Sequence, residues 1–263
     1  MDKKLKVGIL GGTGMVGQRF ISLLENHPWF EVVAIAASPR SAGKTYEEAI
    51  GGRWKMTTPM PEKVKKIVVQ DVSNVKEVAA GVDFVFSAVD MTKDEIKKIE
   101  EEYAKTETPV VSNNSAHRWT PDVPMVVPEL NPEHFEVIEA QKKRLGTTRG
   151  FVAVKPNCSI QSYTPALTAL KKAGFEPKTV VATTYQAISG AGKTFKDWPE
   201  MEHNIIPFIG GEEEKSEQEP LRIWGHVENG EIVKADSPVI TTQCIRVPVL
   251  DGHTAAGFVT FEE

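Results

Sequence analysis

Cysteine is scarce in this chain of 263 residues, since only Cys158 and Cys244 are present. Two cysteines are too few for a disulfide framework and suit a reducing compartment. No apolar run approaches the ~18 residues that a membrane helix needs. The start MDKKLKVGIL leads into a strand without a signal-peptide pattern. We therefore expect a cytoplasmic protein.

An excess of positive charge is also missing, because the formal net charge is −5 at pH 7. This net charge does not indicate a basic surface that would bind nucleic acid or an anionic membrane, so neither is expected as a partner. Apolar residues make up 40% of the chain and charged residues 25%, as in ordinary globular proteins. The length allows one large domain or two modest ones.

Short apolar runs alternate with amphipathic stretches in the first half, which predicts βαβ units and a parallel sheet. Helical spacing is found in residues 15–27 and 92–105. The apolar face of the first helix is expected to carry Val16, Phe20, Leu23 and Leu24. The expected strands are residues 5–10, 32–37, 66–69, 83–88 and 109–112.

The pattern changes from about Pro156, so we expect an α/β domain over 1–155 and an α+β domain over 156–263 with a more antiparallel sheet. An irregular acidic segment is expected at 210–222, with its three consecutive glutamates as a solvated cluster. Strands are expected at 178–188, 241–250 and 255–261. A helix is expected at 159–174, with Ile160, Tyr163, Leu167 and Leu170 on one face.

A glycine-rich turn, Gly12-x-Gly14-x-x-Gly17, follows the first expected strand and opens a helix. The glycines allow a tight turn, close approach of a pyrophosphate and helix–strand packing, which predicts a dinucleotide site. The alternative is a tight turn without a ligand. The second expected strand is followed by no acid for a ribose hydroxyl. Instead it is followed by Ser38, Arg40, Ser41 and Lys44, which favours the 2′-phosphate of NADP over a solvated loop.

Cys158 lies between an expected strand and a helix, where the helix dipole would lower the pKa of its thiol and make it a nucleophile. The alternative, a small buried hydrophobe, suits Cys244 better. A thiolate beside a nicotinamide suggests oxidation or reduction at an aldehyde or activated acyl group. Arg246 and His253, on either side of a turn, are candidates for an anion site and a proton shuttle.

The stretch AISGAGKT, residues 187–194, is close to a phosphate-binding loop, but alanine stands where its first glycine belongs. The following FKDWPE contains Pro199 and continues poorly as a helix. We therefore expect a turn rather than a nucleoside triphosphate site.

Several motifs together, in order along the chain, resemble the aspartate-semialdehyde dehydrogenase family in its archaeal and fungal branch. They are GGTGMVGQRF, SNNSAHRWTPDVPMVVPELN, KPNCS, YQAISGAGKT, EEEK and RVPVLDGHT. The resemblance implies a Rossmann-type domain and a substrate and dimerisation domain, as in glyceraldehyde-3-phosphate dehydrogenase. It implies NADPH-dependent reduction of L-aspartyl 4-phosphate to L-aspartate 4-semialdehyde with release of phosphate, in lysine, threonine, methionine and diaminopimelate biosynthesis. A homodimer or tetramer is also implied, and no metal.

By resemblance, Cys158 is the nucleophile, His253 the acid/base and Gln186 the residue that orients substrate. The residues implied to bind substrate are Arg246, Glu212, Arg118, Lys215 and Asn157, with the register among Glu212 to Glu214 open. The implied cofactor contacts are Gly12, Thr13, Gly14, Met15, Val16, Gly17, Ser38, Arg40, Ser41, Ser189 and Gly190.

Three other readings remain at this stage: a malonyl-CoA-type reductase, an N-acetylglutamyl-phosphate reductase, and a non-catalytic NADP-binding redox sensor. Asn157 beside the cysteine, together with Arg118 and Lys215, favours an acyl phosphate. The motifs KPNCS and YQAISGAG differ from the corresponding motifs of N-acetylglutamyl-phosphate reductase. Members of the resembling family continue past the DGHT strand, so we expect that a final segment is absent from this chain.

Overall fold

The computed structural model describes residues 3–261, and the chain divides into two compact units. The first comprises Met1–Pro124 and Val137–Lys155, and the second comprises Met125–Glu136 and Pro156–Glu263. Met125–Glu136, which was expected in the first domain, belongs to the second unit. In the described part of the chain, no helix has the length and apolar character needed to cross a membrane.

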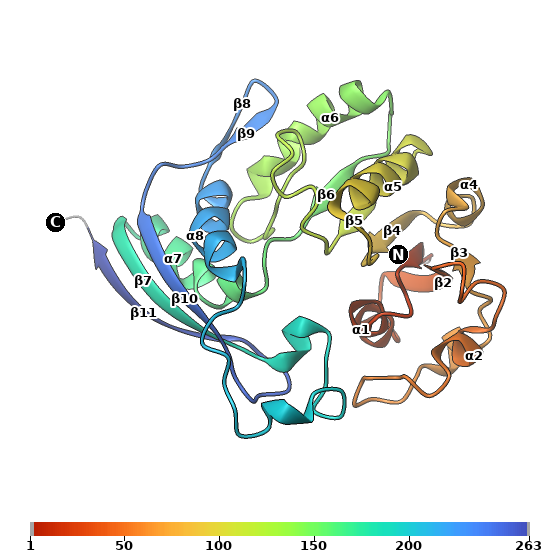
Figure 1. The fold of residues 1–263 in the computed structure, drawn as a ribbon. Coiled ribbons are helices and arrows are strands. Elements are labelled where there is room, and N and C mark those ends of the chain that lie inside the picture. The colour runs from red at the N-terminus through yellow and green to blue at the C-terminus, as the bar shows by residue number, and fades with distance from the viewer. Residues whose placement is uncertain (1–2, 262–263) are drawn as a thin grey trace. The chain divides into compact units, whose positions relative to one another are not determined.

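A six-stranded parallel sheet lies at the centre of the first unit, in the order β3-β2-β1-β4-β5-β6 (Figure 1). The order reverses between β1 and β4, and dinucleotides bind at such a reversal in doubly wound sheets. Val7 and Ile9 are fully buried, as expected for a central strand. The strands are β1 (Leu5–Leu10), β2 (Phe30–Ala37), β3 (Gln70–Asp71), β4 (Phe84–Ser87), β5 (Val110–Ser112) and β6 (Val152–Val154).

Side-chain caps determine where two helices of this unit begin. In α5, Thr92 Oγ1 accepts the Glu95 N–H at 3.4 Å, and the Glu95 carboxylate accepts the Thr92 N–H at 3.0 Å. This capping box satisfies two donors that the first turn would leave free, and Thr45 with Glu48 repeats it in α2. The helices are α1 (Met15–Leu23), α2 (Tyr46–Ile50), α3 (Glu62–Lys65), α4 (Val75–Ala79), α5 (Lys93–Lys105) and α6 (Ile138–Leu145).

The strand expected at 66–69 is wrong, because this run makes only an isolated bridge between Val68 and Thr45. The strand pairing with β2 comes later, at β3. The predicted inner face of α1 is also wrong at Leu23, which is 67% exposed, and at Val16, which is also exposed.

Close approach of α1 to the glycine turn explains its rotated face. A Cβ added at Gly17 would lie 2.4 Å from Gly11 O and 2.6 Å from Gly12 Cα. Because the helix packs on this bare side, Gln18 and Ile21 become its other buried residues.

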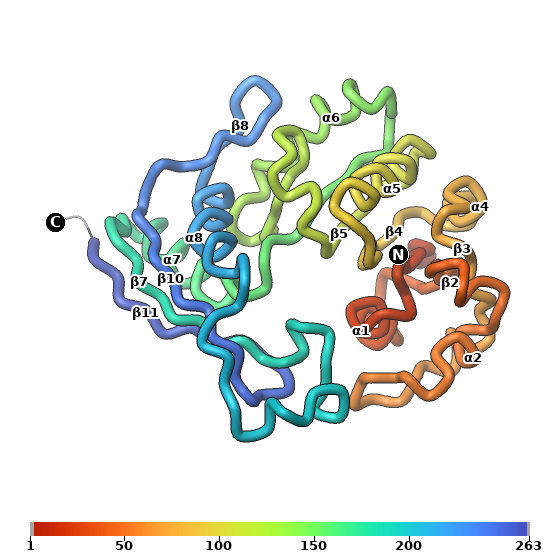
Figure 2. The backbone as a smooth tube through the Cα atoms, viewed as in Figure 1, coloured from red at the N-terminus to blue at the C-terminus, as the bar shows by residue number. Residues whose placement is uncertain are grey.

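A three-stranded mixed sheet, β10-β7-β11, forms the second unit's centre, and its strands can be followed along the tube in Figure 2. Within this sheet the expectation of antiparallel pairing holds for β11 but not for β10, which runs parallel to β7, while β8 and β9 form a separate antiparallel pair. The strands are β7 (Pro177–Gln186), β8 (His226–Glu228), β9 (Glu231–Val233), β10 (Val239–Arg246) and β11 (Thr254–Phe261). The helices are α7 (Thr164–Lys172), α8 (Glu212–Ile223) and the short 3-10 helices η1 (Pro132–Val137), η2 (Ser159–Ser162), η3 (Ile188–Ala191) and η4 (Pro199–Met201).

The segment 210–222, expected to be irregular, contains the helix α8. Three glutamates occupy its first turn, where carboxylates interact favourably with the positive end of the helix dipole. Pro220 lacks the N–H that would bond to the carbonyl of Ser216, and the hydroxyl of Tyr163 donates to that oxygen instead, at 2.6 Å. The helix therefore accommodates a proline inside its last turns.

The single helix expected at 159–174 is divided into η2 and α7, with Tyr163 between them. Ile160, Tyr163 and Leu167 are buried as predicted, but Leu170 is 39% exposed. The change of helix type at Tyr163 alters the angular spacing on which the predicted face depended.

We predict that Gly17→Ala lowers the free energy of unfolding by about 1–3 kcal/mol, the usual cost of overpacking. The added methyl group meets backbone atoms, which cannot move aside as a flexible side chain can. Gly14→Ala is the matched control, because its Cβ would have only an ordinary contact, 3.5 Å from Gly11 O. Urea denaturation of both variants without cofactor tests this, and equal stabilities would contradict it.

Candidate active site

Three strand ends of the second sheet bring candidate residues together. Gln186 ends β7 and pairs in register with Arg246, which ends the parallel strand β10. His253 immediately precedes β11, whose first residue pairs with Tyr185 of β7. The mixed sheet therefore places an amide, a guanidinium and an imidazole at the same end of its three strands.

Cys158 is exposed and precedes η2 rather than a long α-helix. The expectation that a helix dipole activates its thiol is therefore weakened, since four residues of 3-10 helix align few peptide dipoles. Asn157 caps this turn, because its Oδ1 accepts the Ser159 N–H at 2.8 Å and the Ser159 hydroxyl at 2.7 Å.

An imidazole faces the sulfur directly. His253 Nε2 lies 3.2 Å from Cys158 Sγ. On the other side of the ring, the backbone N–H of Ala187 donates to Nδ1 at 3.0 Å. The thiol and the imidazole predicted from separate motifs thus form one pair.

Gly190 packs against this pair without a side chain. A Cβ there would lie 3.0 Å from both Cε1 and Nε2 of His253 and 2.8 Å from Nη1 of Arg246. That guanidinium is itself anchored, since Nη1 donates to the carbonyl of Ala187 at 2.8 Å. Glycine at position 190 is therefore required by the imidazole and the guanidinium.

Arg246 is 6% exposed. Burial lowers the pKa of its guanidinium, while the neighbouring Glu212 and Cys158 oppose that change. The group remains a cation at neutral pH, because arginine starts from a very high pKa. A buried cation near the sulfur is suited to a carboxylate ligand, which could bind its planar fork.

Glu212 connects the start of α8 to the cysteine turn. Its Oε2 accepts Asn157 Nδ2 at 2.9 Å and Gln186 Nε2 at 3.4 Å, and its Oε1 accepts Lys215 Nζ at 2.7 Å. Burial raises the pKa of this carboxyl, but the hydrogen bonds from Lys215, Asn157 and Gln186 outweigh it, so the pKa is lowered overall. Glu212 is therefore an anion within the site, not part of a solvated cluster.

The hydrogen bonds indicate which of the three consecutive glutamates lies in the site. Glu213 Oε1 accepts the backbone N–H of Cys244 at 3.4 Å, and Glu214 is exposed. Of the three, Glu212 is the one that contacts Asn157 and Gln186. Its contact with a substrate ammonium stays a prediction.

The glycine turn of the first unit fits a pyrophosphate. Gly11 has φ +78°, which favours glycine, and Tyr46 donates to Gly12 O at 2.8 Å and so holds the turn. Gly14 is the N-cap of α1, and no side chain within residues 3–261 caps its free N–H groups. A bare, uncapped helix start of this kind is suited to an anionic ligand. The predicted contacts Thr13, Met15, Val16 and Gly17 belong to this turn and helix start.

The predicted 2′-phosphate residues follow β2, at the same strand ends as the glycine turn. The N–H groups of Gly11 and Gly12 both donate to Ala36 O near the end of β2, at 2.8 and 3.2 Å. Ser38 O accepts the Ser41 N–H at 2.9 Å, forming a turn on which Arg40 is exposed.

Arg118, predicted to bind phosphate, belongs to the first unit and is buried there. Its Nε donates to Lys155 O at 3.0 Å and its Nη2 to Asn113 O at 3.4 Å. Ser189 and Gly190, predicted to face the nicotinamide, belong to η3. The roles of these residues toward phosphate and cofactor stay predictions.

The segment 187–194 contains η3, and turns rather than an α-helix follow Thr194. The expectation of a turn at this point is therefore confirmed by the structure. Within the described residues, no α-helix begins directly after Lys193, as one would in a phosphate-binding loop.

Sequence reasoning missed α8 as a support for the cysteine turn. Glu219 is 1% exposed and accepts the Asn157 N–H at 2.5 Å, and Ser216 contacts Ser159 at 2.9 Å. Glu212, Ser216 and Glu219 follow helical i, i+4, i+7 spacing. This spacing is the signal in the sequence that could have predicted the helix, had the segment not been expected to be irregular.

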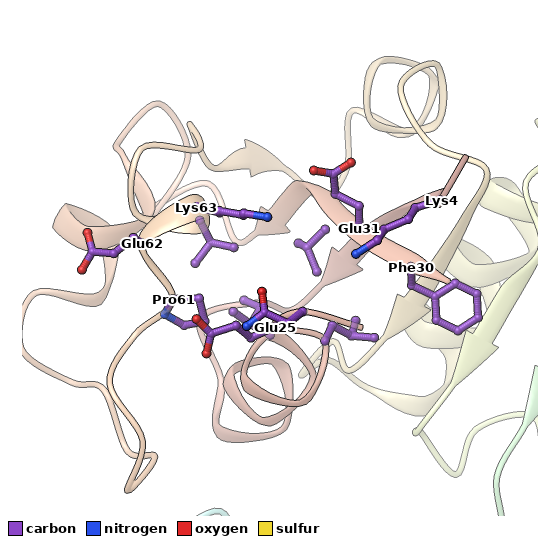
Figure 3. Close-up of a pocket in the computed structure, with 12 residues that line it drawn as sticks. Lys4, Glu25, Phe30, Glu31, Pro61, Glu62 and Lys63 are labelled. Atoms are coloured by element: carbon purple, nitrogen blue, oxygen red, sulfur yellow. The ribbon is translucent and has the colours of Figure 1, made fainter. Parts of the chain in front are cut away.

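A hollow of about 200 Å³ lies in the first unit near the amino ends of β1 and β2. Lys4 and Lys63 reach toward it from opposite sides (Figure 3). The glycine turn follows the carboxyl end of β1, so this hollow is separate from the predicted cofactor site.

Two family models match the chain. The model described as semialdehyde dehydrogenase, NAD binding domain, matches residues 6–138, and the one described as semialdehyde dehydrogenase, dimerisation domain, matches residues 167–263. Aspartate-semialdehyde dehydrogenase from Methanothermobacter thermautotrophicus is 44% identical over 261 residues, covering 98% of this chain and 72% of that protein. The Saccharomyces cerevisiae enzyme is 41% identical, covering 97% and 70%.

Solved structures of similar fold bear the same name. Crystalline aspartate semialdehyde dehydrogenase with NADP from Candida albicans superposes with a TM-score of 0.85 at 39% identity, covering 99% of this chain and 72% of that one. Aspartate semialdehyde dehydrogenase II from Vibrio cholerae, complexed with ASA, has a TM-score of 0.69 at 25% identity, covering 99% and 75%.

We predict that Gly190→Ala slows alkylation of Cys158 by iodoacetamide by about tenfold. The added methyl group would displace the imidazole, and a hydrogen bond to a charged group contributes about 1.5–3 kcal/mol. Gly210→Ala is the matched control, because a Cβ there meets nothing within 4 Å. Mass spectrometry of the modified peptide follows the rate. Equal rates in the two variants would show that Gly190 does not hold the pair.

Proposed function

Because the chain belongs to the aspartate-semialdehyde dehydrogenase family, we propose that it reduces L-aspartyl 4-phosphate to L-aspartate 4-semialdehyde with NADPH, releasing phosphate. This reaction is a step toward lysine, threonine and methionine, and toward diaminopimelate in bacteria. We place it in the cytoplasm, a setting consistent with both cysteines being free thiols. The observation that supports the proposal most is the 3.2 Å contact between Cys158 Sγ and His253 Nε2.

The thiolate of Cys158 attacks the acyl carbon of the substrate, forming a thioester as phosphate leaves. Within residues 3–261, the backbone N–H of Cys158 donates no hydrogen bond. This N–H is therefore suited to bind the carbonyl oxygen of the substrate as negative charge develops there. Bound NADPH supplies the two electrons and the hydrogen that reduce the thioester. Collapse of the reduced intermediate returns the electron pair to sulfur and frees the aldehyde.

Opposite charges at the site match an amino acid. Arg246 supplies a buried cation for the α-carboxylate, and Glu212 supplies an anion for the ammonium group. Gln186, hydrogen-bonded to Glu212, orients the substrate beside the sulfur. Lys215 supplies a cation suited to the phosphate group, and Asn157 positions the turn that carries the thiol.

The reverse reaction tests this function. The protein with aspartate semialdehyde, NADP and phosphate should produce NADPH, measured by absorbance. Cys158→Ala should reduce the rate by about four orders of magnitude or more, since loss of a nucleophile removes the covalent route. It should retain NADPH binding. The matched control Cys244→Ala, at a buried thiol outside the pair, should retain turnover. Production of NADPH with CoA in place of phosphate would contradict the assignment.

Arg40→Glu tests the cofactor site. We predict a loss of NADP affinity of at least about tenfold, because a charge-assisted hydrogen bond to phosphate contributes about 1.5–3 kcal/mol. Affinity for NAD should change far less. Fluorescence titration with both dinucleotides measures the ratio, and an equal loss for both would refute contact with the 2′-phosphate.

We further propose that two copies of the chain associate through the outer face of the second sheet. The exposed apolar residues Val181 and Tyr185 of β7, Val239 of β10 and Phe258 of β11 share this face, as their pairing registers require. Phe258 is 83% exposed. A contiguous apolar face of this kind suits association, and a dimerisation-domain model covers all three strands.

Phe258→Asp should convert the dimer to monomer, because it places a charge in an apolar interface. Sedimentation velocity of the wild type and variant at equal concentration measures the change. Leu23→Asp, at another exposed apolar residue, in the first unit, should leave the dimer intact. A monomeric wild type, or a Phe258→Asp variant that stays dimeric, would contradict this interface.

A further inference from the structure

A buried tyrosine holds the glycine turn of the first unit. Tyr46 is fully buried, and its hydroxyl donates to Gly12 O at 2.8 Å. Its ring packs in the core with Val7, Ile9 and Ile35. Burial raises the pKa of the phenol well above its ordinary value, so the hydroxyl keeps the proton that it donates. The turn therefore rests on a donor whose position is fixed by the core.

The hydrogen bond to Gly12 O fixes the direction of the next N–H group. In a planar trans peptide the C=O and N–H point in opposite directions, so a bond at Gly12 O orients the N–H of Thr13. Within residues 3–261 this N–H donates no hydrogen bond, and Thr13 is only half-buried. An unpaired N–H just before α1 is suited to a phosphate oxygen.

The following peptide of the turn is held by other groups. Gln18 Nε2 donates to Thr13 O at 3.0 Å, and the Gly14 N–H donates to Gly11 O at 3.1 Å. No backbone N–H within the described chain donates to Gly12 O. The peptide between Gly12 and Thr13 therefore depends on Tyr46 for its orientation.

Tyr46 also lies directly after the loop that carries the predicted 2′-phosphate residues. It is the first residue of α2, and its N–H donates to Ile67 O at 2.8 Å. Thr45 and Glu48 cap the same helix. The side chain thus joins the end of the loop 38–44 to the turn that is suited to a pyrophosphate.

We propose that Tyr46 is a positioning residue of the NADP site, which aligns the Thr13 N–H with the pyrophosphate through its hydrogen bond to Gly12 O. The hydroxyl acts through the peptide and does not touch the cofactor itself. The inference deepens the proposed function and rests on its cofactor site, but it does not depend on the chemistry at the cysteine.

Tyr46→Phe removes the hydroxyl and keeps the packed ring. We expect NADPH to bind about tenfold more weakly, because a well-aligned hydrogen bond to a charged group contributes a factor of at least this size. In the reverse reaction the KM for NADP should rise by the same factor, whereas kcat should change by less than about twofold, since the reacting groups are untouched. Isothermal titration calorimetry and initial rates measure the two effects.

Tyr103→Phe is the matched control. Tyr103 is also fully buried in the first unit, and its hydroxyl donates to Val72 O at 2.9 Å, outside the glycine turn. Both variants lose one hydrogen bond to a backbone carbonyl, so they should lose similar thermal stability. Tyr46→Phe alone should lose affinity for NADPH. Equal affinities in the two variants, whether wild-type or reduced, would overturn the inference.

NMR of the wild type tests the contact at Thr13 directly. In the full chain labelled with ¹⁵N-threonine, the Thr13 signal is assigned from its absence in Thr13→Ser. Its N–H proton should shift downfield when NADPH binds, and Tyr46→Phe should reduce that shift. A Thr13 signal that stays unchanged at saturation with NADPH would overturn the inference. A wild type that binds NADPH with this shift but does not turn over would refute the proposed reaction and support the role of Tyr46.

Discussion

The contact between Cys158 Sγ and His253 Nε2 is the interaction on which the site depends. It joins a turn after β6 to the start of β11, and a hydrogen bond holds each side. The Ala187 N–H holds the imidazole, and Asn157 caps the turn that carries the thiol. Because these hydrogen bonds hold the imidazole and the cysteine turn in place, the reacting pair is preorganised before substrate binds, as electrostatic catalysis requires.

Each unit contributes a different kind of recognition. In the first, recognition depends on a missing side chain, because Gly17 lets α1 come close to the glycine turn and the uncapped N–H groups at the helix start are suited to an anion. In the second, it depends on placed charge, with Arg246 as a buried cation and Glu212 as an anion held ionised by its hydrogen bonds. A dinucleotide and a small zwitterion are the ligands that these two chemistries suit.

Local patterns predicted the first sheet, the glycine turn and the individual candidates for the reacting pair. They failed where tertiary contacts override local preference. Helix α8 contains Pro220 and an acidic run, and the hydroxyl of Tyr163, at the junction of η2 and α7, satisfies the carbonyl that the proline leaves free. Leu23 has helical spacing but is exposed, because Gly17 fixes the face of α1. No local pattern reports that the N–H of Ala187 meets an imidazole 66 positions away.

Trapping of the covalent intermediate tests the central claim most directly. Aspartate semialdehyde and NADP, mixed with the protein without phosphate, should give a stoichiometric burst of NADPH and then stop. Mass spectrometry after acid quenching should find an aspartyl thioester on the peptide that contains Cys158. Formation of NADPH with no adduct, or with the adduct on Cys244, would contradict the account.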